Sequence, residues 1–148
     1  MEESKLPLVM VVDDDRPLVD MVCEGLEEAG ITALSCTRSE DAFAAIHQHR
    51  PAVVILDVQM PEVDGLKVFR EMRADPASRK TPVIFFTGNV AKLKRWLPNY
   101  KHLDAELLPK PFDFDRLLDL VQQALQPQNK ASKLQPQNTT STLQGTGS

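Results

Sequence analysis

Residues 52–57 read Ala-Val-Val-Ile-Leu-Asp, and residues 8–13 read Leu-Val-Met-Val-Val-Asp. In each stretch, five consecutive apolar residues end in an aspartate. A continuous apolar run of this length, without alternation of apolar and polar residues, is typical of a strand in a parallel sheet that helices cover on both faces. Three more short and mostly apolar runs complete a set of five predicted strands, at residues 31–36, 82–86 and 105–108.

Helical patterns lie between these runs. Apolar residues recur at helical spacing within residues 18–29, 43–46, 66–72, 90–97 and 117–125. Gly30, Pro51 and Pro98 stand where the first, second and fourth of these helices would end, and Asp113 is a candidate N-cap for the fifth. Strands that alternate with helices in this way predict the α/β class, with a (βα)5 doubly wound, parallel five-stranded sheet between two helical layers.

Polar side chains follow four of the five predicted strands. They are Asp13, Asp14 and Asp15 after the first strand, Asp57 after the third, Thr87 after the fourth and Lys110 after the fifth. In open α/β sheets, functional groups collect beyond the carboxyl ends of the strands. Converging carboxylates repel one another unless a hard cation lies between them, and Mg²⁺ is the natural cation for such a set. A carboxylate beside this metal can attack phosphorus and form an acyl phosphate, while a lysine and a hydroxyl bind the phosphoryl oxygens.

The segments that contain these residues resemble the receiver domain of two-component response regulators. They read Met-Val-Val-Asp-Asp-Asp-Arg at 10–16, Ile-Leu-Asp-Val-Gln-Met-Pro at 55–61, Asp-Gly at 64–65, Thr at 87 and Lys-Pro-Phe at 110–112. The resemblance covers about residues 6–125. It implies a flavodoxin-like fold with strand order 2-1-3-4-5 and a cis peptide bond between Lys110 and Pro111, which proline tolerates.

The resemblance also implies a role for each residue of the set. Asp57 would be the phosphoacceptor, phosphorylated by a histidine kinase in a Mg²⁺-dependent reaction, and Thr87 and Lys110 would bind the phosphoryl group. The implied Mg²⁺ ligands are Asp13, Asp14, Asp57 and the backbone carbonyl of Gln59. A domain of this kind is a signalling module and not an enzyme in the ordinary sense, since it catalyses only its own phosphotransfer and autodephosphorylation.

The implied partners are a sensor histidine kinase or phosphotransfer protein and an output partner or covalently linked effector domain. In receivers, the surface formed by helix four, strand five and helix five commonly meets the partner. In this chain the corresponding stretch is basic and aromatic on an otherwise acidic domain. We therefore expect the output surface to include Lys92, Lys94, Arg95, Trp96 and Tyr100.

Composition limits the remaining possibilities. The chain has 148 residues and a formal net charge of −4, and residues 1–125 carry 15 basic and 21 acidic groups. This acidic balance argues against direct nucleic-acid binding by the domain. The longest apolar runs have about five residues, far short of the ~20 that a membrane span needs. Without a cationic segment leading into a longer apolar core, a secretory signal is not expected either, and we predict a cytoplasmic protein that does not bind membranes.

The composition changes at Gln126. From there on Gln, Asn, Ser, Thr, Pro and Gly dominate, and the motif Gln-Pro-Gln-Asn occurs twice, at 126–129 and 135–138. A segment this poor in apolar side chains does not bury enough surface to offset its ordering entropy. We therefore predict a receiver domain in residues 1–125 and a disordered tail or linker in residues 126–148.

Two alternatives to a phosphorylated switch each depend on the residue at one position of the sequence. Receivers generally carry Tyr or Phe three residues before the lysine, and this chain has Leu107 there, which leaves open a receiver-like protein-interaction module that works without phosphorylation. The second alternative is an aspartate-nucleophile phosphohydrolase. Enzymes of the haloacid dehalogenase type need a second aspartate two residues after the first, where this chain has Gln59, so this alternative is the weaker one.

Overall fold

The computed structural model describes residues 7–126, and these form a single five-stranded parallel sheet with the strand order β2-β1-β3-β4-β5. The strands are β1 (Leu8–Val12), β2 (Thr32–Cys36), β3 (Val53–Leu56), β4 (Val83–Thr87) and β5 (Ala105–Pro109). The predicted α/β class, the (βα)5 topology and the strand order 2-1-3-4-5 are therefore confirmed. Each predicted strand lies within two residues of its observed bounds.

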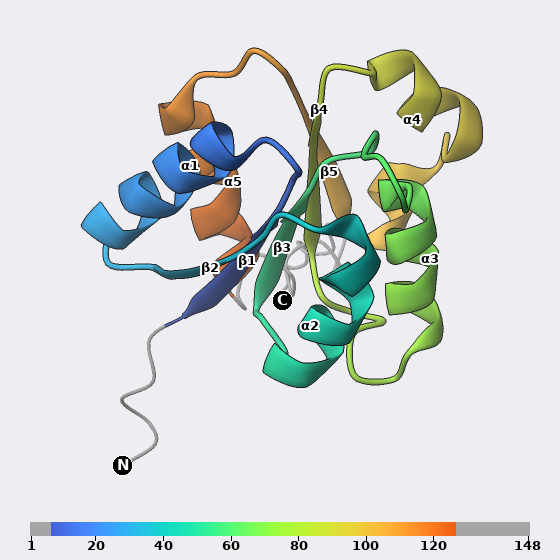
Figure 1. Cartoon of the computed structure of the whole chain (residues 1–148), viewed down its shortest axis with the longest axis horizontal. Coiled ribbons are helices and arrows are strands. Elements are labelled where there is room, and N and C mark those ends of the chain that lie inside the picture. Colours follow the sequence, from blue (N-terminus) through green and yellow to red (C-terminus); the bar gives the residue numbers. More distant parts are fainter. Residues whose placement is uncertain (1–6, 127–148) are drawn as a thin grey trace, which may run out of the picture.

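Helices cover both faces of this sheet, with α1 and α5 on one side and α2, α3 and α4 on the other (Figure 1). Their bounds are α1 (Arg16–Glu28), α2 (Ala42–His49), α3 (Gly65–Ala74), α4 (Val90–Trp96) and α5 (Phe114–Leu125), with 3-10 turns η2 (Ser39–Asp41) and η3 (Tyr100–Leu103). The predicted cap of α5 is confirmed, and α1 also has an aspartate as its N-cap. Asp15 accepts a hydrogen bond from Leu18 N–H, and Asp113 accepts one from Asp115 N–H, so each carboxylate satisfies a free amide of the first turn.

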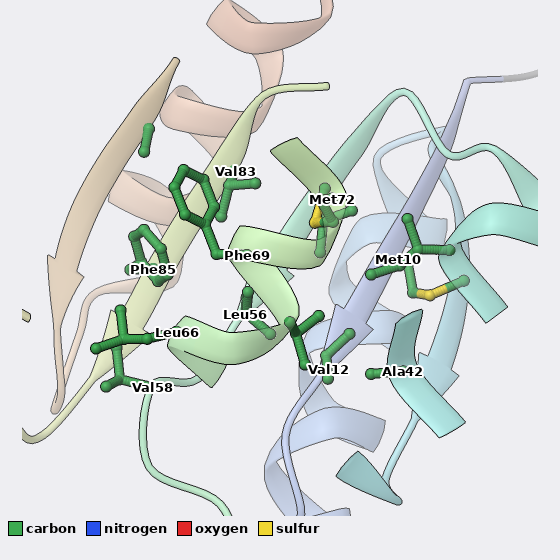
Figure 2. Packing of buried hydrophobic residues seen from close by; sticks show 14 of the residues in the cluster. Met10, Val12, Ala42, Leu56, Val58, Leu66, Phe69, Met72, Val83 and Phe85 are labelled. Carbon is green, nitrogen blue, oxygen red and sulfur yellow. The ribbon is translucent and has the colours of Figure 1, made fainter. Parts of the chain in front are cut away.

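Each strand contributes alternate residues to two hydrophobic cores. In β1, Val9 and Val11 pack toward α1 and α5, whereas Met10 and Val12 pack toward α2 and α3. Figure 2 shows the core between the sheet and the helices α2 and α3. In this core Phe69 of α3 packs against Phe85 of β4, with their ring centroids 5.1 Å apart. Burial of each such side chain stabilises the fold by about 1.5–3 kcal/mol. The packed sheet therefore holds the residues at its strand ends in fixed positions.

The register of the sheet decides which strand ends meet. Val12 of β1 pairs with Leu56 of β3, and Leu56 pairs with Phe85 of β4. Asp13 directly follows Val12, and Asp57 directly follows Leu56. The two aspartates therefore lie side by side at the carboxyl ends of β1 and β3. At the other edge, Thr87 pairs with Pro109, so the residue after Pro109 emerges beside the end of β4.

Residues 1–6 of the predicted domain and nearly all of the predicted tail lie outside the described residues. These residues stop at Gln126, the C-cap of α5, so the predicted tail or linker beyond it is not described. Within residues 7–126, none of the helices combines the length and apolar character that a bilayer span requires.

Candidate functional site

Three aspartates form a cluster at the carboxyl edge of the sheet. Oxygen atoms of Asp13, Asp14 and Asp57 all lie within 4.8 Å of one another. Asp13 and Asp57 are buried, whereas Asp14 is exposed. The backbone holds the two buried residues in place, because Asp57 N–H donates to the Val12 carbonyl at 3.0 Å and Asp13 N–H donates to the Cys36 carbonyl at 3.2 Å. The predicted convergence of these carboxylates is therefore observed.

Lys110 lies over the same cluster. Its Nζ is 2.6 Å from Asp13 Oδ2 and 3.6 Å from Asp57 Oδ2, and it stands 5.0 Å from the centre of the Phe86 ring. The chain presents this side chain from the end of β5, where Lys110 N–H donates to the Thr87 carbonyl at 2.9 Å. The predicted cis bond between Lys110 and Pro111 is observed.

The cluster carries more negative charge than the lysine neutralises. Burial, followed by the nearby charge of Asp13, raises the pKa of Asp57 from its ordinary value of 3.8 to about 6, although Lys110 opposes the shift. Burial also raises the pKa of Asp13. Three carboxylates this close together, two of them desolvated, are suited to a hard divalent cation that prefers oxygen ligands. The donor set of this structure thus fits Mg²⁺.

Thr87 completes the inner part of the site. Its side chain is buried at the end of β4, where interaction with the hydroxyl lowers the pKa of Asp57 and so opposes the effect of burial. Thr87 Oγ1 also accepts a hydrogen bond from Asn89 N–H at 2.9 Å. All residues that the sequence predicts for the site, Asp13, Asp14, Asp57, Gln59, Thr87 and Lys110, are therefore neighbours at one edge of the sheet.

The rim of the site holds contacts that sequence reasoning missed. Asn89 Nδ2 donates to Gln59 Oε1 at 2.5 Å and joins the loop after β4 to the loop after β3. Lys92 Nζ lies 2.5 Å from Asp64 Oδ2, the same carboxylate that caps α3. The polar side chains give no signal of these pairings in the sequence, since the partners are 28 to 30 residues apart.

The role of Gly65 is also not predicted from the sequence. The dipeptide Asp64-Gly65 is typical of a turn, but the sequence does not show what the glycine contacts. A Cβ atom at Gly65 would lie 1.9 Å from the carbonyl oxygen of Asp57, far inside van der Waals contact. The glycine therefore lets α3 begin directly against the backbone of the central aspartate.

The residues predicted for the output surface differ in their exposure. Trp96 is 58% exposed and Lys94 and Arg95 are exposed beside it on α4. Tyr100, in contrast, is only 8% exposed and packs in the hydrophobic core, so the prediction that it lies on this surface is wrong. Lys92 lies on the same helix, but its ammonium is engaged by Asp64.

Comparison with known proteins agrees with this geometry. The sequence profile of the response regulator receiver domain matches residues 9–122. The chain belongs to the response regulator receiver domain family. Receiver domains are phosphoacceptor modules of two-component systems, and they are signalling domains rather than classical enzymes. The predicted family and function are thus confirmed, and neither the unphosphorylated module nor the phosphohydrolase is favoured. The cluster of three aspartates is the kind of acidic pocket at which receivers bind Mg²⁺.

The curated relatives that the chain matches are longer than the chain. It is 32% identical over 129 residues to the regulatory protein AtoC of Escherichia coli, with coverage of 85% of this chain and 27% of AtoC. It is 30% identical over 125 residues to the response regulator Rre1 of Synechocystis, with coverage of 84% and 54%. The chain thus spans about a quarter to about half of the curated relatives it matches.

Solved structures show the same fold. The chemotaxis response regulator CheY4 of Vibrio cholerae superposes with a TM-score of 0.72 at 28% identity, over 82% of this chain and 100% of CheY4. The receiver domain of the Francisella response regulator 1452 superposes with a TM-score of 0.71 at 26% identity, over 80% and 96% of the two chains.

Proposed function

We propose that Asp57 is the phosphoacceptor of this receiver domain. The observation that carries the proposal is the difference between the two buried carboxylates. Both oxygens of Asp13 have close partners, because its Oδ2 binds Lys110 Nζ at 2.6 Å and its Oδ1 accepts a hydrogen bond from Asp15 N–H at 3.0 Å. The contacts of Asp57 are longer, since it accepts a hydrogen bond from Gln59 N–H at 3.4 Å and its Oδ2 lies 3.6 Å from Lys110 Nζ. The Thr87 hydroxyl also interacts with Asp57. A nucleophilic carboxylate needs an oxygen lone pair that is not already bound, and Asp57 meets this condition better.

Phosphotransfer at this site joins Asp57 Oδ to phosphorus while the bond from phosphorus to the donor's histidine nitrogen breaks. The electron pair of that bond stays on the imidazole, which takes up a proton as it leaves. Lys110 is placed to exchange Asp13 for a phosphoryl oxygen, and the Thr87 hydroxyl is placed to donate to another. Asp13, Asp14, Asp57 and the backbone carbonyl of Gln59 would hold Mg²⁺, which when bound would supply positive charge to the phosphoryl oxygens.

The proposed donors are a sensor histidine kinase or a phosphotransfer protein. The proposed output surface consists of Lys94, Arg95 and Trp96 on α4, all exposed, and it meets an output partner or a covalently linked effector domain. The acidic domain is not expected to bind nucleic acid or a membrane itself. In the same proposal residues 1–125 are the receiver domain, residues 126–148 are a tail or linker, and the protein is cytoplasmic.

Intact-protein mass spectrometry tests the phosphoacceptor assignment. The protein is incubated with acetyl phosphate, with and without Mg²⁺, as the native chain, as Asp57→Asn and as the control Asp119→Asn, which changes an exposed aspartate of α5. We expect a single phosphoryl adduct in the native chain and the control, only with Mg²⁺, and none in Asp57→Asn. The assignment would be refuted if folded Asp57→Asn formed the phosphoryl adduct to the same extent as the native chain. If rapid hydrolysis hides the adduct, ¹⁹F NMR of bound beryllofluoride, a phosphoryl mimic that does not hydrolyse, provides the second measurement.

A further inference from the structure

The loop between β2 and α2 carries none of the residues of the site, yet it contacts the two loops that follow β1 and β3. The carbonyl of Cys36, the last residue of β2, accepts a hydrogen bond from Asp13 N–H at 3.2 Å. Further along the loop, Ser39 Oγ accepts a hydrogen bond from Val63 N–H at 2.9 Å. Val63 lies in the connection between β3 and α3, which also contains Gln59. The β2–α2 loop therefore supports the site from outside it.

Ser39 is a fixed point in this loop. Its side chain is 4% exposed, and it begins the 3-10 turn η2. Its carbonyl accepts a hydrogen bond from Ala42 N–H, and Ala42 is itself fully buried in the core at the start of α2. An amide that loses its acceptor in such surroundings is costly, so the Ser39 hydroxyl restricts where the backbone of Val63 can lie.

A buried serine at this position has a distinct partner. Burial of a hydroxyl is unfavourable unless it is hydrogen-bonded. Of the five polar side chains that are buried within residues 7–126, three belong to the site. The fourth, Ser78, donates to the Met72 carbonyl at 2.9 Å and so binds the helix that precedes it. The fifth is Ser39, whose partner lies 24 residues away in a loop of the site.

The chain between Val63 and Gln59 is short and stiff. Pro61 fixes its own φ, and the residue before a proline is restricted to extended conformations. That residue is Met60, which is 8% exposed and packs in the same core as Val63. A shift of the Val63 backbone is therefore passed along the chain to Gln59 and is not absorbed between them.

We propose that Ser39 is a positioning residue for the Mg²⁺ site, because its hydroxyl holds the β3–α3 loop at Val63 and so fixes the backbone carbonyl of Gln59. The inference rests on the proposed function, in which that carbonyl is a Mg²⁺ ligand. Without the hydroxyl, the loop keeps its core contact through Met60 but loses its hydrogen bond to the β2–α2 loop. The Gln59 carbonyl is then held less firmly, and Mg²⁺ binds more weakly. Ser39 acts through the loop and is not itself a ligand.

The test measures Mg²⁺ affinity and stability side by side in the full chain. Isothermal titration calorimetry with Mg²⁺ alone gives the affinity, urea denaturation in EDTA gives the stability, and hydrogen exchange reports on the Val63 amide. Ser39→Ala removes the hydroxyl, whereas Ser39→Thr keeps it. The matched control is Ser78→Ala, which removes a buried serine hydroxyl of the same kind from the loop before β4.

We expect both alanine variants to lower the urea midpoint, since each loses a buried hydrogen bond. Mg²⁺ affinity should fall about fivefold in Ser39→Ala, the factor that the loss of one hydrogen bond typically produces, and should stay within a factor of about two of the native value in Ser78→Ala and Ser39→Thr. The Val63 amide should exchange faster in Ser39→Ala than in Ser78→Ala. If Ser39→Ala is too unstable to titrate, Ser39→Cys takes its place, because a thiol is a weaker acceptor than a hydroxyl.

The results that overturn the inference are distinguishable from a failure of the proposed function. The role of Ser39 alone is refuted if folded Ser39→Ala binds Mg²⁺ no more weakly than the native chain, if Ser78→Ala loses as much affinity, or if Ser39→Thr binds as weakly as Ser39→Ala. A folded native chain that binds no Mg²⁺ refutes the Mg²⁺ dependence of the proposed function, and this inference with it. The phosphoryl adduct at Asp57 is measured separately by mass spectrometry.

Discussion

Replacement of Asp57 by asparagine is expected to stabilise the fold at neutral pH when no divalent cation is present. The carboxylate is 5% exposed and lies among two other aspartates, so the folded protein holds it at an electrostatic cost. An asparagine of nearly the same shape removes the charge and leaves the packing intact. The most useful test of the phosphoacceptor for signalling is thus also a test of the electrostatics of the site.

The magnitude follows from the pKa of Asp57, which burial raises from 3.8 to about 6. Because the folded state binds this proton more tightly than the unfolded state, the stability due to this group is greatest below pH 3.8. It falls as the pH rises and is fully lost above about pH 6. A difference of 6 against 3.8, at 1.36 kcal/mol for each pKa unit, corresponds to about 3 kcal/mol. Asp57→Asn should recover up to this amount at pH 7.5, or on the order of 10 °C in Tm.

The assay is urea denaturation of the native chain and Asp57→Asn in EDTA between pH 3.5 and pH 7.5, repeated at pH 7.5 with Mg²⁺. The exposed carboxylates titrate alike in both proteins, so the difference in the free energy of unfolding reports the loss of the Asp57 charge together with its coupling to Asp13. We expect this difference to be small at the acid end and to grow as the pH rises. Mg²⁺ should stabilise the native chain more than the variant, because the variant lacks one proposed ligand.

The reasoning would be refuted by a variant that is no more stable than the native chain at pH 7.5, or by a difference that grows as the pH falls. The control Asp119→Asn, at an exposed position, should change the free energy of unfolding by no more than about 0.5 kcal/mol at any pH in this range.

Two further substitutions test the geometry around this carboxylate. Gly65→Ala should destabilise the protein by about 1–3 kcal/mol or more, because its Cβ would lie 1.9 Å from the Asp57 carbonyl oxygen. Gly88→Ala, with open space at the same atom, is the matched control, and equal urea midpoints for both variants would contradict the packing argument. Lys110→Met should tighten Mg²⁺ binding in calorimetry, since it removes an ammonium 2.6 Å from Asp13, and should weaken beryllofluoride binding. Weaker Mg²⁺ binding would show that the lysine does not compete with the cation.

Much of the fold is encoded locally, and the sequence alone therefore predicts it. Continuous apolar runs identify strands that are covered on both faces, and the capping aspartates and prolines mark where helices begin and end. The membership of the inner site also follows from sequence, because the carboxyl ends of parallel strands share one edge of a sheet. Asp13, Asp57, Thr87 and Lys110 each follow or end such a strand, and all four meet in the structure.

Only the tertiary structure decides how the loops around that edge contact one another. Tyr100 belongs to a basic and aromatic stretch, yet it turns into the core, and the ammonium of Lys92 is engaged by a carboxylate 28 residues earlier in the chain. Asn89 caps α4, and its side-chain amide also reaches Gln59 across the site. Such contacts depend on loop paths and on the packing of α4 against its neighbours. Composition and periodicity describe one segment at a time, and therefore do not contain this information.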